Sequence, residues 1–253
     1  DQKFLPMLNA PNGLVYLTGP TGSGKSTTLY MVLEYLSHRQ VNIATVEDPV
    51  EKTLPFVSQT QVNTAAGLTF ETGLRALLRQ DPDIIMVGET RDATTASISV
   101  RAAITGHLVF STLHTNDAVS SIMRLADMGV ERYLIASSLV GIVAQRLMRK
   151  VCPNCAEPVP TTAVERDILG QDCTTIRRGA GCLQCSGTGY RGRVAVHEIV
   201  AIDAPIRHMI VTGAEADEIA AYAREHQGMK RLREKGIELV KQGVTTPEEL
   251  AKL

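Results

Sequence analysis

Short apolar runs alternate with longer helical patterns over the first part of the chain. The runs have the length of β-strands, are bounded by Gly, Pro, Asp or Asn, and cover Leu14–Thr18, Asn42–Val46, Ile84–Gly88 and His107–Thr112. The intervening segments predict helices at Lys25–His38, Phe70–Gln80, Ala93–Ile104 and Asp117–Met128. This alternation predicts an α/β fold with a mainly parallel sheet, whose ligands bind beyond the carboxyl ends of the strands.

The rest of the chain has a different pattern. Apolar residues at every fourth position predict one long helix over Glu131–Lys150, stopped by Pro153. Residues 151–190 are rich in Pro and Gly and contain paired cysteines, which indicates a small metal module. One strand at Arg193–Val200 precedes helical segments at Ala214–Gln227, Lys230–Gln242 and Thr246–Leu253. We therefore expect three parts, which are a core over 1–150, a metal module over 151–190 and a C-terminal strand and helical subdomain over 191–253.

Composition narrows the functional classes. Hydrophobic residues make up 44% of the 253 positions and charged residues 21%, which is typical of a globular protein. The 26 basic and 27 acidic side chains argue against a protein whose whole surface is basic and binds nucleic acid or membrane. No apolar stretch has the ~18 residues of a membrane-spanning helix. The sequence opens at Asp1 without a secretory signal, so we expect a cytosolic protein.

A glycine-rich loop follows the first predicted strand and precedes the first predicted helix. It matches the pattern G-x-x-x-x-G-K-[ST] from Gly19 to Ser26. Glycines let backbone N–H groups approach phosphates, the helix N-terminus adds a positive dipole, Lys25 reaches the β and γ oxygens, and Ser26 can ligate Mg²⁺. We expect ATP to bind at Gly19, Pro20, Thr21, Gly22, Ser23, Gly24, Lys25, Ser26 and Thr27.

Acidic residues stand where two other strands end. Glu89 follows the predicted strand Ile84–Gly88, and Gly88 occupies the place where an Asp usually precedes such a Glu. Glu47 and Glu51 follow the second strand and could orient or deprotonate the attacking water. A solvated turn at the strand end is the alternative for each of them.

Two histidines bracket the fourth predicted strand, with His107 at its start and His114 at its end. His114 is a candidate to contact the γ-phosphate or to report its presence to a neighbouring subunit. A structural role is the alternative for both, and it has most weight for His107.

Two CxxC pairs are separated by 26 residues and comprise Cys152, Cys155, Cys182 and Cys185. Four thiolates close a tetrahedral site without leaving an open ligand position, so we expect a structural Zn²⁺ ion that stabilises this apolar-poor segment. Cys173 is left over as a free thiol. A redox role for either pair is the alternative.

In this order the motifs resemble the ATPases of type II secretion and type IV pilus assembly, of the GspE/PilB kind. The resemblance covers nearly the whole chain. It rests on the loop Gly19–Thr27, the acidic box Val46–Glu51, the stretch Leu78–Asp92 with Gly before Glu89, the histidine box Thr105–Asp117 and the four cysteines. The cysteines are typical of the extension and secretion members of the family.

The resemblance implies a RecA-like P-loop core in a homo-hexameric ring, cytoplasmic and peripheral to an inner membrane. ATP hydrolysis would act on a membrane platform protein and drive pilin or pseudopilin assembly. Carried over to this chain, Lys25 and Ser26 bind phosphates and Mg²⁺, Glu89 and Glu47 are the catalytic acids, and His107 and His114 form the histidine box. Arg75, Arg79 and Arg91 are candidates to reach a nucleotide across a subunit boundary.

Two other functions remain open at the level of sequence. A RecA-like nucleic-acid translocase needs a basic, aromatic-bearing surface, whereas Glu215–Leu253 has seven basic and eight acidic residues and the chain has only 4% aromatics. The second is an ATP-binding assembly fragment with little hydrolysis of its own. Assays of nucleic-acid binding and of turnover separate these functions from a motor.

Overall fold

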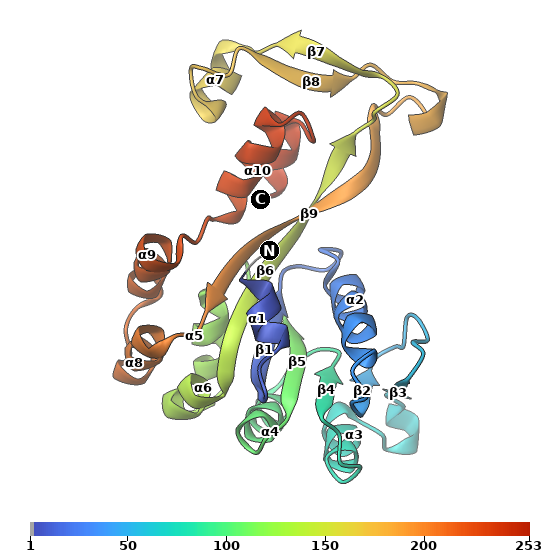
Figure 1. Cartoon of the computed structure of the whole chain (residues 1–253), viewed down its shortest axis with the longest axis vertical. Helices are drawn as coiled ribbons and strands as arrows, with labels where there is room; N and C mark the ends of the chain where they lie inside the picture. The colour runs from blue at the N-terminus through green and yellow to red at the C-terminus, as the bar shows by residue number, and fades with distance from the viewer. Residues whose placement is uncertain (1–2) are drawn as a thin grey trace. The chain divides into compact units, whose positions relative to one another are not determined.

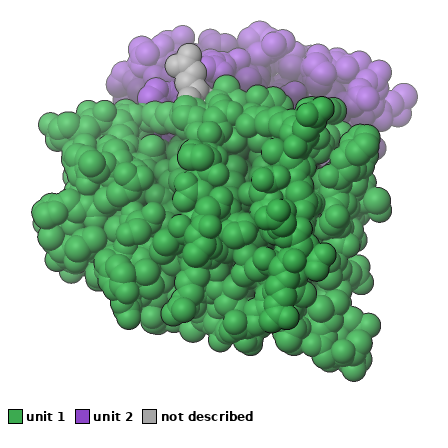
Figure 2. Space-filling model, turned by 60° about the horizontal axis from the view of Figure 1, so that its bottom comes forward, with its two compact units in different colours: residues 1–21, 25–144, 199–229 green, residues 22–24, 145–198, 230–253 purple. Residues whose placement is uncertain are grey.

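The computed structural model describes residues 3–253, so the opening Asp1 lies outside the described residues. The described chain forms two compact units, which Figure 2 shows in green and purple. The first unit contains residues 3–21, 25–144 and 199–229, and the second contains residues 22–24, 145–198 and 230–253. The segment expected over 191–253 is therefore shared between the two units.

A seven-stranded sheet has the strand order β3-β2-β4-β5-β1-β6-β9 (Figure 1). Its strands are β1 Gly13–Thr18, β2 Ile43–Glu47, β3 Val57–Gln61, β4 Ile84–Val87, β5 Leu108–Leu113, β6 Leu139–Val151 and β9 Tyr190–Ala201. Parallel pairing joins β3 to β2, β2 to β4, β4 to β5, β5 to β1 and β1 to β6. The predicted α/β fold with a mainly parallel sheet is confirmed, and the four strands expected in the core are all present.

Helices connect and cover these strands. The first unit contains α1 Phe4–Leu8, α2 Lys25–Ser37, α3 Phe70–Leu77, α4 Ala93–Ile104, α5 Ser120–Asp127, α6 Arg132–Ser138, α8 Ala204–Thr212 and α9 Ala216–Gln227. Asp92 is the N-cap of α4, and its side chain accepts the backbone N–H of Thr95. Asp117 precedes α5 by three residues and accepts the backbone N–H of Ser120. Both acids lie in the turns that follow β4 and β5.

The central strands are buried on both faces, because helices pack on each side of the sheet. Val15 and Leu17 of β1 join Leu108 and Phe110 of β5 in one core with α1 and α2. The alternate residues face α4, which packs on β1 and β5. The buried face of α2 includes Leu29, Leu33 and Leu36, each almost fully buried. Burial of one such leucine contributes about 1.5–3 kcal/mol.

The prediction of one long helix over Glu131–Lys150 is wrong. Helix α6 ends at Ser138, and residues 139–151 form strand β6 beside β1. A four-residue spacing of apolar residues fits both structures, because every fourth residue also lies on one face of a strand. Burial on both faces of the sheet then favours the strand, which the β-branched residues of this segment suit.

The second unit contains the strand pair β7 Ala156–Pro160 and β8 Thr175–Gly179, with α7 Ala163–Leu169 between them, and α10 Leu232–Lys241 near the end of the chain. Short 3₁₀ turns lie at Leu183–Cys185 and Pro247–Lys252, and another lies at Thr64–Ala66 in the first unit. The predicted helical segments that end at Gln227 and Gln242 are each followed by a glycine, Gly228 and Gly243, and both glycines have positive φ angles at helix ends. No helix among residues 3–253 has the length and apolar character required to cross a bilayer.

Candidate nucleotide-binding site

The phosphate loop joins the end of β1 to the start of α2. Gly22 and Gly24 have φ angles of 78° and 85°, in the left-handed region that favours glycine. Pro20, Thr21 and Gly22 form an exposed tip, whereas Ser23 and Lys25 are buried. Ser26 and Thr27 stand in the first turn of α2, so the backbone N–H groups of a helix N-terminus border the loop.

Buried polar groups in this loop fit a phosphate ligand. The ammonium group of Lys25 donates to the carbonyl oxygens of Gly19 at 2.6 Å and Pro20 at 3.0 Å. The hydroxyl of Ser23 is buried without a hydrogen-bond partner in the described part of the chain. An unmatched buried hydroxyl is costly, and a phosphate oxygen would satisfy it. The loop is therefore suited to bind a nucleoside triphosphate.

The end of β5 is bonded to the start of the phosphate loop. The N–H of Gly19 donates to the carbonyl of Leu113 at 3.3 Å, and the N–H of Thr115 donates to the hydroxyl of Thr18 at 3.0 Å. His114 lies between these two anchors in the chain. The structure thus brings His114 to the same edge of the sheet as the loop.

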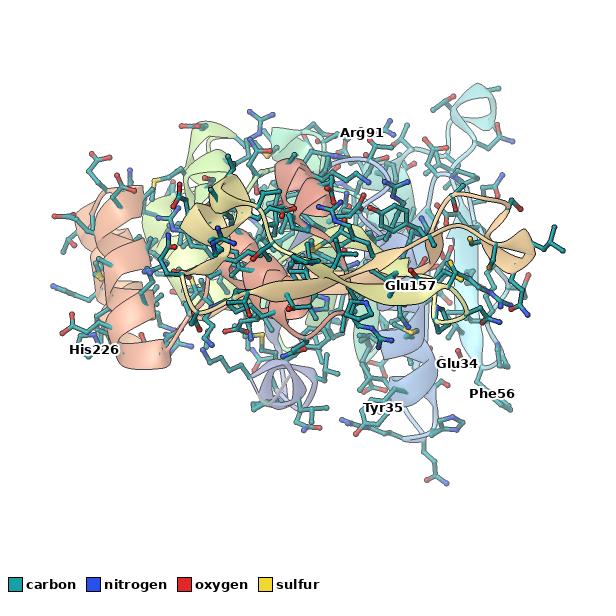
Figure 3. All side chains as sticks on the ribbon, turned by 90° about the horizontal axis from the view of Figure 1, so that it is seen from above. Glu34, Tyr35, Phe56, Arg91, Glu157 and His226 are labelled. Atoms are coloured by element: carbon teal, nitrogen blue, oxygen red, sulfur yellow. The ribbon has the colours of Figure 1, made fainter. Side chains whose placement is uncertain are left out.

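Charged residues at the ends of β2, β4 and β5 form one cluster, which we call the strand-end cluster: Asp48, Glu89, Arg91 and His114. Glu89 forms an ion pair with Arg91, and its carboxylate lies 3.7 Å from His114 Nε2. Arg91, labelled in Figure 3, also lies 3.9 Å from the carboxylate of Asp48. The bond to Glu89 raises the pKa of Arg91, so this cation stays charged.

Strand order places Glu89 to the side of the phosphate loop. β5 separates β4 from the loop strand β1, so Glu89 stands two strand spacings, roughly 10 Å, to the side of the loop. A triphosphate that extends from the loop along this edge would bring its terminal phosphate toward the strand-end cluster. The turn that follows β4 and contains Glu89 is held against β5, because the N–H of Thr90 donates to the carbonyl of Thr112 at 2.9 Å.

Gly88 has a steric reason to replace the usual Asp. Its N–H donates to the carbonyl of Val46 at 2.8 Å. A Cβ atom at this position would lie 3.3 Å from both that carbonyl oxygen and the Cα of Glu47. The close approach of β2 and β4 therefore favours a residue without a side chain.

Glu47 has a different environment from Glu89. It is only 3% exposed, and its carboxylate accepts bonds from Tyr30 at 2.5 Å, Thr45 at 2.5 Å and Gln59 at 3.0 Å. Burial and the bond to Glu47 raise the pKa of Tyr30 to about 12, so the phenol keeps its proton. Both carboxylate oxygens of Glu47 are thus engaged by protein donors.

The other predicted residues lie apart from the strand-end cluster. His107 stands before the first residue of β5, at the opposite end of that strand from His114, and its Nδ1 lies 2.9 Å from the carbonyl of Ala102. Glu51 donates its backbone N–H to the Tyr30 hydroxyl at 3.0 Å. Arg75 pairs with Glu71 on the surface of α3.

The four predicted metal ligands come together in the second unit. The sulfur atoms of Cys152, Cys155, Cys182 and Cys185 all lie within 4.8 Å of one another. Three of the separations are 3.7, 3.8 and 3.9 Å. A tetrahedral ion with zinc–sulfur bonds of about 2.3 Å requires sulfur separations of about 3.8 Å.

Backbone donors support this cluster. Sγ of Cys185 accepts the N–H groups of Cys182 at 3.1 Å and Gly189 at 3.3 Å. The Cys182 bond is the largest influence that lowers the pKa of Cys185, to about 6, and thiolate is the form that binds metals. Cys173 lies outside the group and its thiol is 3.8 Å from the carbonyl of Thr175.

Comparison with known proteins identifies the family. The family model described as "Type II/IV secretion system protein" matches residues 1–252. The chain belongs to this family. It is 49% identical over 257 residues to the type IV pilus assembly ATPase PilB of Thermus thermophilus, covering 98% of this chain and 28% of that protein. It is 48% identical over 250 residues to the type II secretion system protein E of Aeromonas hydrophila, covering 98% and 50%.

Solved structures agree with this family assignment. The structure of the pilus retraction motor PilT with bound ADP superposes with a TM-score of 0.76 at 30% identity, covering the whole of this chain and 64% of that one. The Legionella pneumophila ATPase DotB gives a TM-score of 0.71 at 25% identity, covering 100% and 62%. The chain spans half or less of the length of the two curated relatives named above.

Some residues of the site escaped the sequence reasoning. Asp48, rather than Glu47 or Glu51, is the member of the acidic box that meets Arg91. Its neighbour Pro49 and its place after a buried strand gave no means to choose among the three acids. Gln145 also contacts the phosphate loop, at the carbonyl oxygen of Ser23, and it lies in the segment for which the apolar spacing predicts a helix.

Proposed function

We propose that this chain is an ATP-hydrolysing motor domain of a type II secretion or type IV pilus assembly system. The observation that carries the proposal is the phosphate loop, whose buried Lys25 begins α2 after β1, at the sheet edge where Glu89 follows β4. The loop also contains the buried Ser23 hydroxyl, which has no hydrogen-bond partner among the described residues. The named relatives are secretion and pilus proteins, which favours this function over a nucleic-acid translocase.

Each residue of the site has a proposed role in hydrolysis. Lys25 leaves the loop carbonyls to bind the β and γ oxygens, and Ser26 holds Mg²⁺. ATP with Mg²⁺ supplies the phosphoanhydride bond that is cleaved. Glu89 orients or deprotonates the attacking water, and Arg91 must release it for this role. His114 contacts or reports the γ-phosphate, whereas His107 has a structural place at the end of α4.

Glu47 belongs to the site in a supporting role. Its carboxylate joins α2, through Tyr30, to β3, through Gln59. This support holds the start of the loop that carries Asp48. Asp48 is then the acid that competes with Glu89 for Arg91.

The second unit contributes a structural Zn²⁺ site. Four sulfur ligands at tetrahedral separations favour zinc, and no ligand position is left for a substrate. Zinc would hold the knuckles at both ends of a segment that contains few buried apolar residues.

Family membership supports a proposal for the assembly. We propose a homo-hexamer in the cytoplasm, held at the inner membrane by a platform protein, where turnover drives the assembly of pilin or pseudopilin subunits. Analytical ultracentrifugation with and without ATP tests the oligomer. A chain that stays monomeric in both conditions at high concentration would contradict the ring.

Two substitutions test hydrolysis. Lys25→Ala should weaken ATP binding, whereas Glu89→Gln should keep binding and lower kcat by about 100-fold or more, because only the base is lost. Isothermal titration and phosphate release measure the two steps. Glu157→Gln, an identical exchange at an exposed position on β7 (Figure 3), is the matched control.

Normal turnover in both substituted chains would refute the assignment. Binding of ATP without turnover by the unsubstituted chain would instead identify an assembly fragment. Tight binding of nucleic acid at physiological salt would favour the translocase.

A further inference from the structure

A buried glutamine reaches the middle of the phosphate loop. Gln145 of β6 is 1% exposed, and its Nε2 donates to the carbonyl oxygen of Ser23 at 2.8 Å. His197 of β9 lies behind it, with Nε2 3.0 Å from Gln145 Oε1. Ser23, Gln145 and His197 all belong to the second unit, which includes the loop residues Gly22–Gly24. No sequence motif pointed to either Gln145 or His197.

We propose that Gln145 and His197 are positioning residues of the phosphate loop, and that they set the affinity of this chain for nucleotide. The inference rests on the proposed function. Neither residue is expected to touch the reacting atoms; Gln145 acts on the loop backbone, and His197 acts through Gln145.

The partners fix the orientation of the glutamine amide. The Ser23 carbonyl only accepts, so the Gln145 amide must turn its NH₂ group toward the loop and its oxygen toward β9. His197 must then carry a proton on Nε2 and donate it to that oxygen. If the amide turned over, its oxygen would face the Ser23 carbonyl and its NH₂ group would face a donor. His197 therefore holds the glutamine in the one productive orientation.

Burial agrees with this assignment. It lowers the pKa of His197, which favours the neutral ring at physiological pH. The neutral ring has a single N–H group, and the hydrogen bond to Gln145 is satisfied when that proton is on Nε2.

The bond matters because the loop is glycine-rich. Ser23 stands between Gly22 and Gly24, whose backbone can adopt many conformations. In a planar trans peptide the C=O and N–H groups point to opposite sides. When Gln145 holds the Ser23 carbonyl, the N–H of Gly24 must point away from β6, which is the orientation that a phosphate on the open side of the loop requires.

The packing is tight at this point. A Cβ atom on Gly24 would lie 3.0 Å from Gln145 Nε2 and 3.2 Å from Leu147 Cδ1. β6 therefore supports the loop by contact as well as by a hydrogen bond. The loop conformation is prepared before the nucleotide arrives, so less order has to be imposed on binding.

The test exchanges one atom of Gln145. In Gln145→Glu, the carboxylate still accepts from His197 but cannot donate to Ser23, and it repels the carbonyl. We expect the KM for ATP and the dissociation constant for ADP to rise about tenfold or more, as for the loss of a buried hydrogen bond. The kcat at saturating ATP should change less than about threefold, because the strand-end cluster is untouched.

Gln227→Glu is the matched control. Gln227 also donates to backbone, at the carbonyl of Ala201, and accepts the N–H of the same residue; its Nε2 donates to Asp203 Oδ2 as well, at 2.9 Å. It belongs to the first unit, whereas Gly22–Gly24 of the loop belong to the second. This exchange should lower the melting temperature and leave the KM unchanged. A purely structural role of Gln145 would give the same pattern in Gln145→Glu.

A second pair of variants carries the test if Gln145→Glu does not fold. His197→Leu should raise the KM for ATP severalfold, and His197→Gln, whose amide can donate to Gln145, should restore it. The double variant Gln145→Leu, His197→Leu should be no worse than Gln145→Leu alone, because both act through one bond. If the wild-type chain binds ATP and the KM is unchanged in these variants, the inference about Gln145 and His197 is overturned and the proposed function still stands. A wild-type chain that binds no ATP would overturn the proposed function.

Discussion

Two acids that are adjacent in the chain have different surroundings. Glu47 ends β2, is buried and accepts hydrogen bonds from three side chains. Asp48, the next residue, is partly exposed and lies near Arg91. Successive side chains of an extended segment point in opposite directions, so one acid stabilises the fold and its neighbour faces the site. A role in catalysis therefore has to be argued residue by residue, even within one motif.

Tyr30 carries a prediction at this scale. Its hydroxyl donates to Glu47 and accepts the N–H of Glu51, so Tyr30→Phe should lower the free energy of unfolding by about 1–3 kcal/mol at pH 8. The pKa of Tyr30 is about 12 in the folded chain, above the ordinary value of 10. The unfolded chain therefore ionises first, and this contribution is complete below pH 10 and is lost as the pH rises toward 12.

Urea unfolding at pH 8 and at pH 11 measures both effects. The loss of stability between these values should be smaller in Tyr30→Phe than in the wild-type chain. Tyr35→Phe, at an exposed position of the same helix, is the control. If the wild-type chain, Tyr30→Phe and Tyr35→Phe lose the same unfolding free energy between pH 8 and pH 11, the hydrogen bonds of Tyr30 contribute nothing to this pH dependence.

Strand β6 is the element that connects the parts of the site. It pairs with β1 over Leu139–Ala144, passes the phosphate loop at Gln145 and ends at the first cysteine knuckle. β9 returns beside it, since Ile202 N–H donates to Val140 O at one end and Cys152 N–H donates to Gly189 O at the other. The two strands are therefore antiparallel and support both the loop and the cysteine cluster.

A substitution at Gly141 tests how closely β6 packs against α1 in the first unit. A Cβ atom on Gly141 would lie 2.3 Å from the sulfur of Met7 in α1, so Gly141→Ala should cost about 1–3 kcal/mol of stability through overpacking. Met7→Ala by itself should also destabilise, because it leaves a cavity. The double variant should be more stable than the sum of the two losses predicts, which chemical denaturation measures. Additive losses would show that the two residues do not share the space.

At the scale of the whole molecule, the four-cysteine cluster and the middle of the phosphate loop belong to the same unit. The cluster joins the end of β6 to the turn before β9. If the cluster binds Zn²⁺ as proposed, loss of the ion should loosen these strands and, with them, the support of Gln145 for the loop.

Cys152→Ser tests this connection. The wild-type chain should contain about one Zn²⁺, and Cys152→Ser should lose it, because three thiolates leave the tetrahedral site incomplete. The KM for ATP should rise together with the loss of metal. Elemental analysis and steady-state kinetics make the two measurements, and Cys173→Ser, outside the cluster, should change neither. A wild-type chain that is folded and contains no metal would contradict the zinc site.

The sequence by itself predicted the parallel sheet, the glycine-rich loop between β1 and α2, the position of Glu89 after β4 and the clustering of the four cysteines. These features depend on local order: strand, glycine loop and helix follow one another in the chain, and each CxxC pair forms within one turn. The tertiary structure decided the rest. Apolar residues spaced by four fit a strand as well as a helix, so only burial beside β1 defined β6. Likewise, the choice of Asp48 for the strand-end cluster and the contact of Gln145 with Ser23 depend on segments that are distant in the chain, because side-chain direction and neighbouring strands are fixed only when the sheet forms.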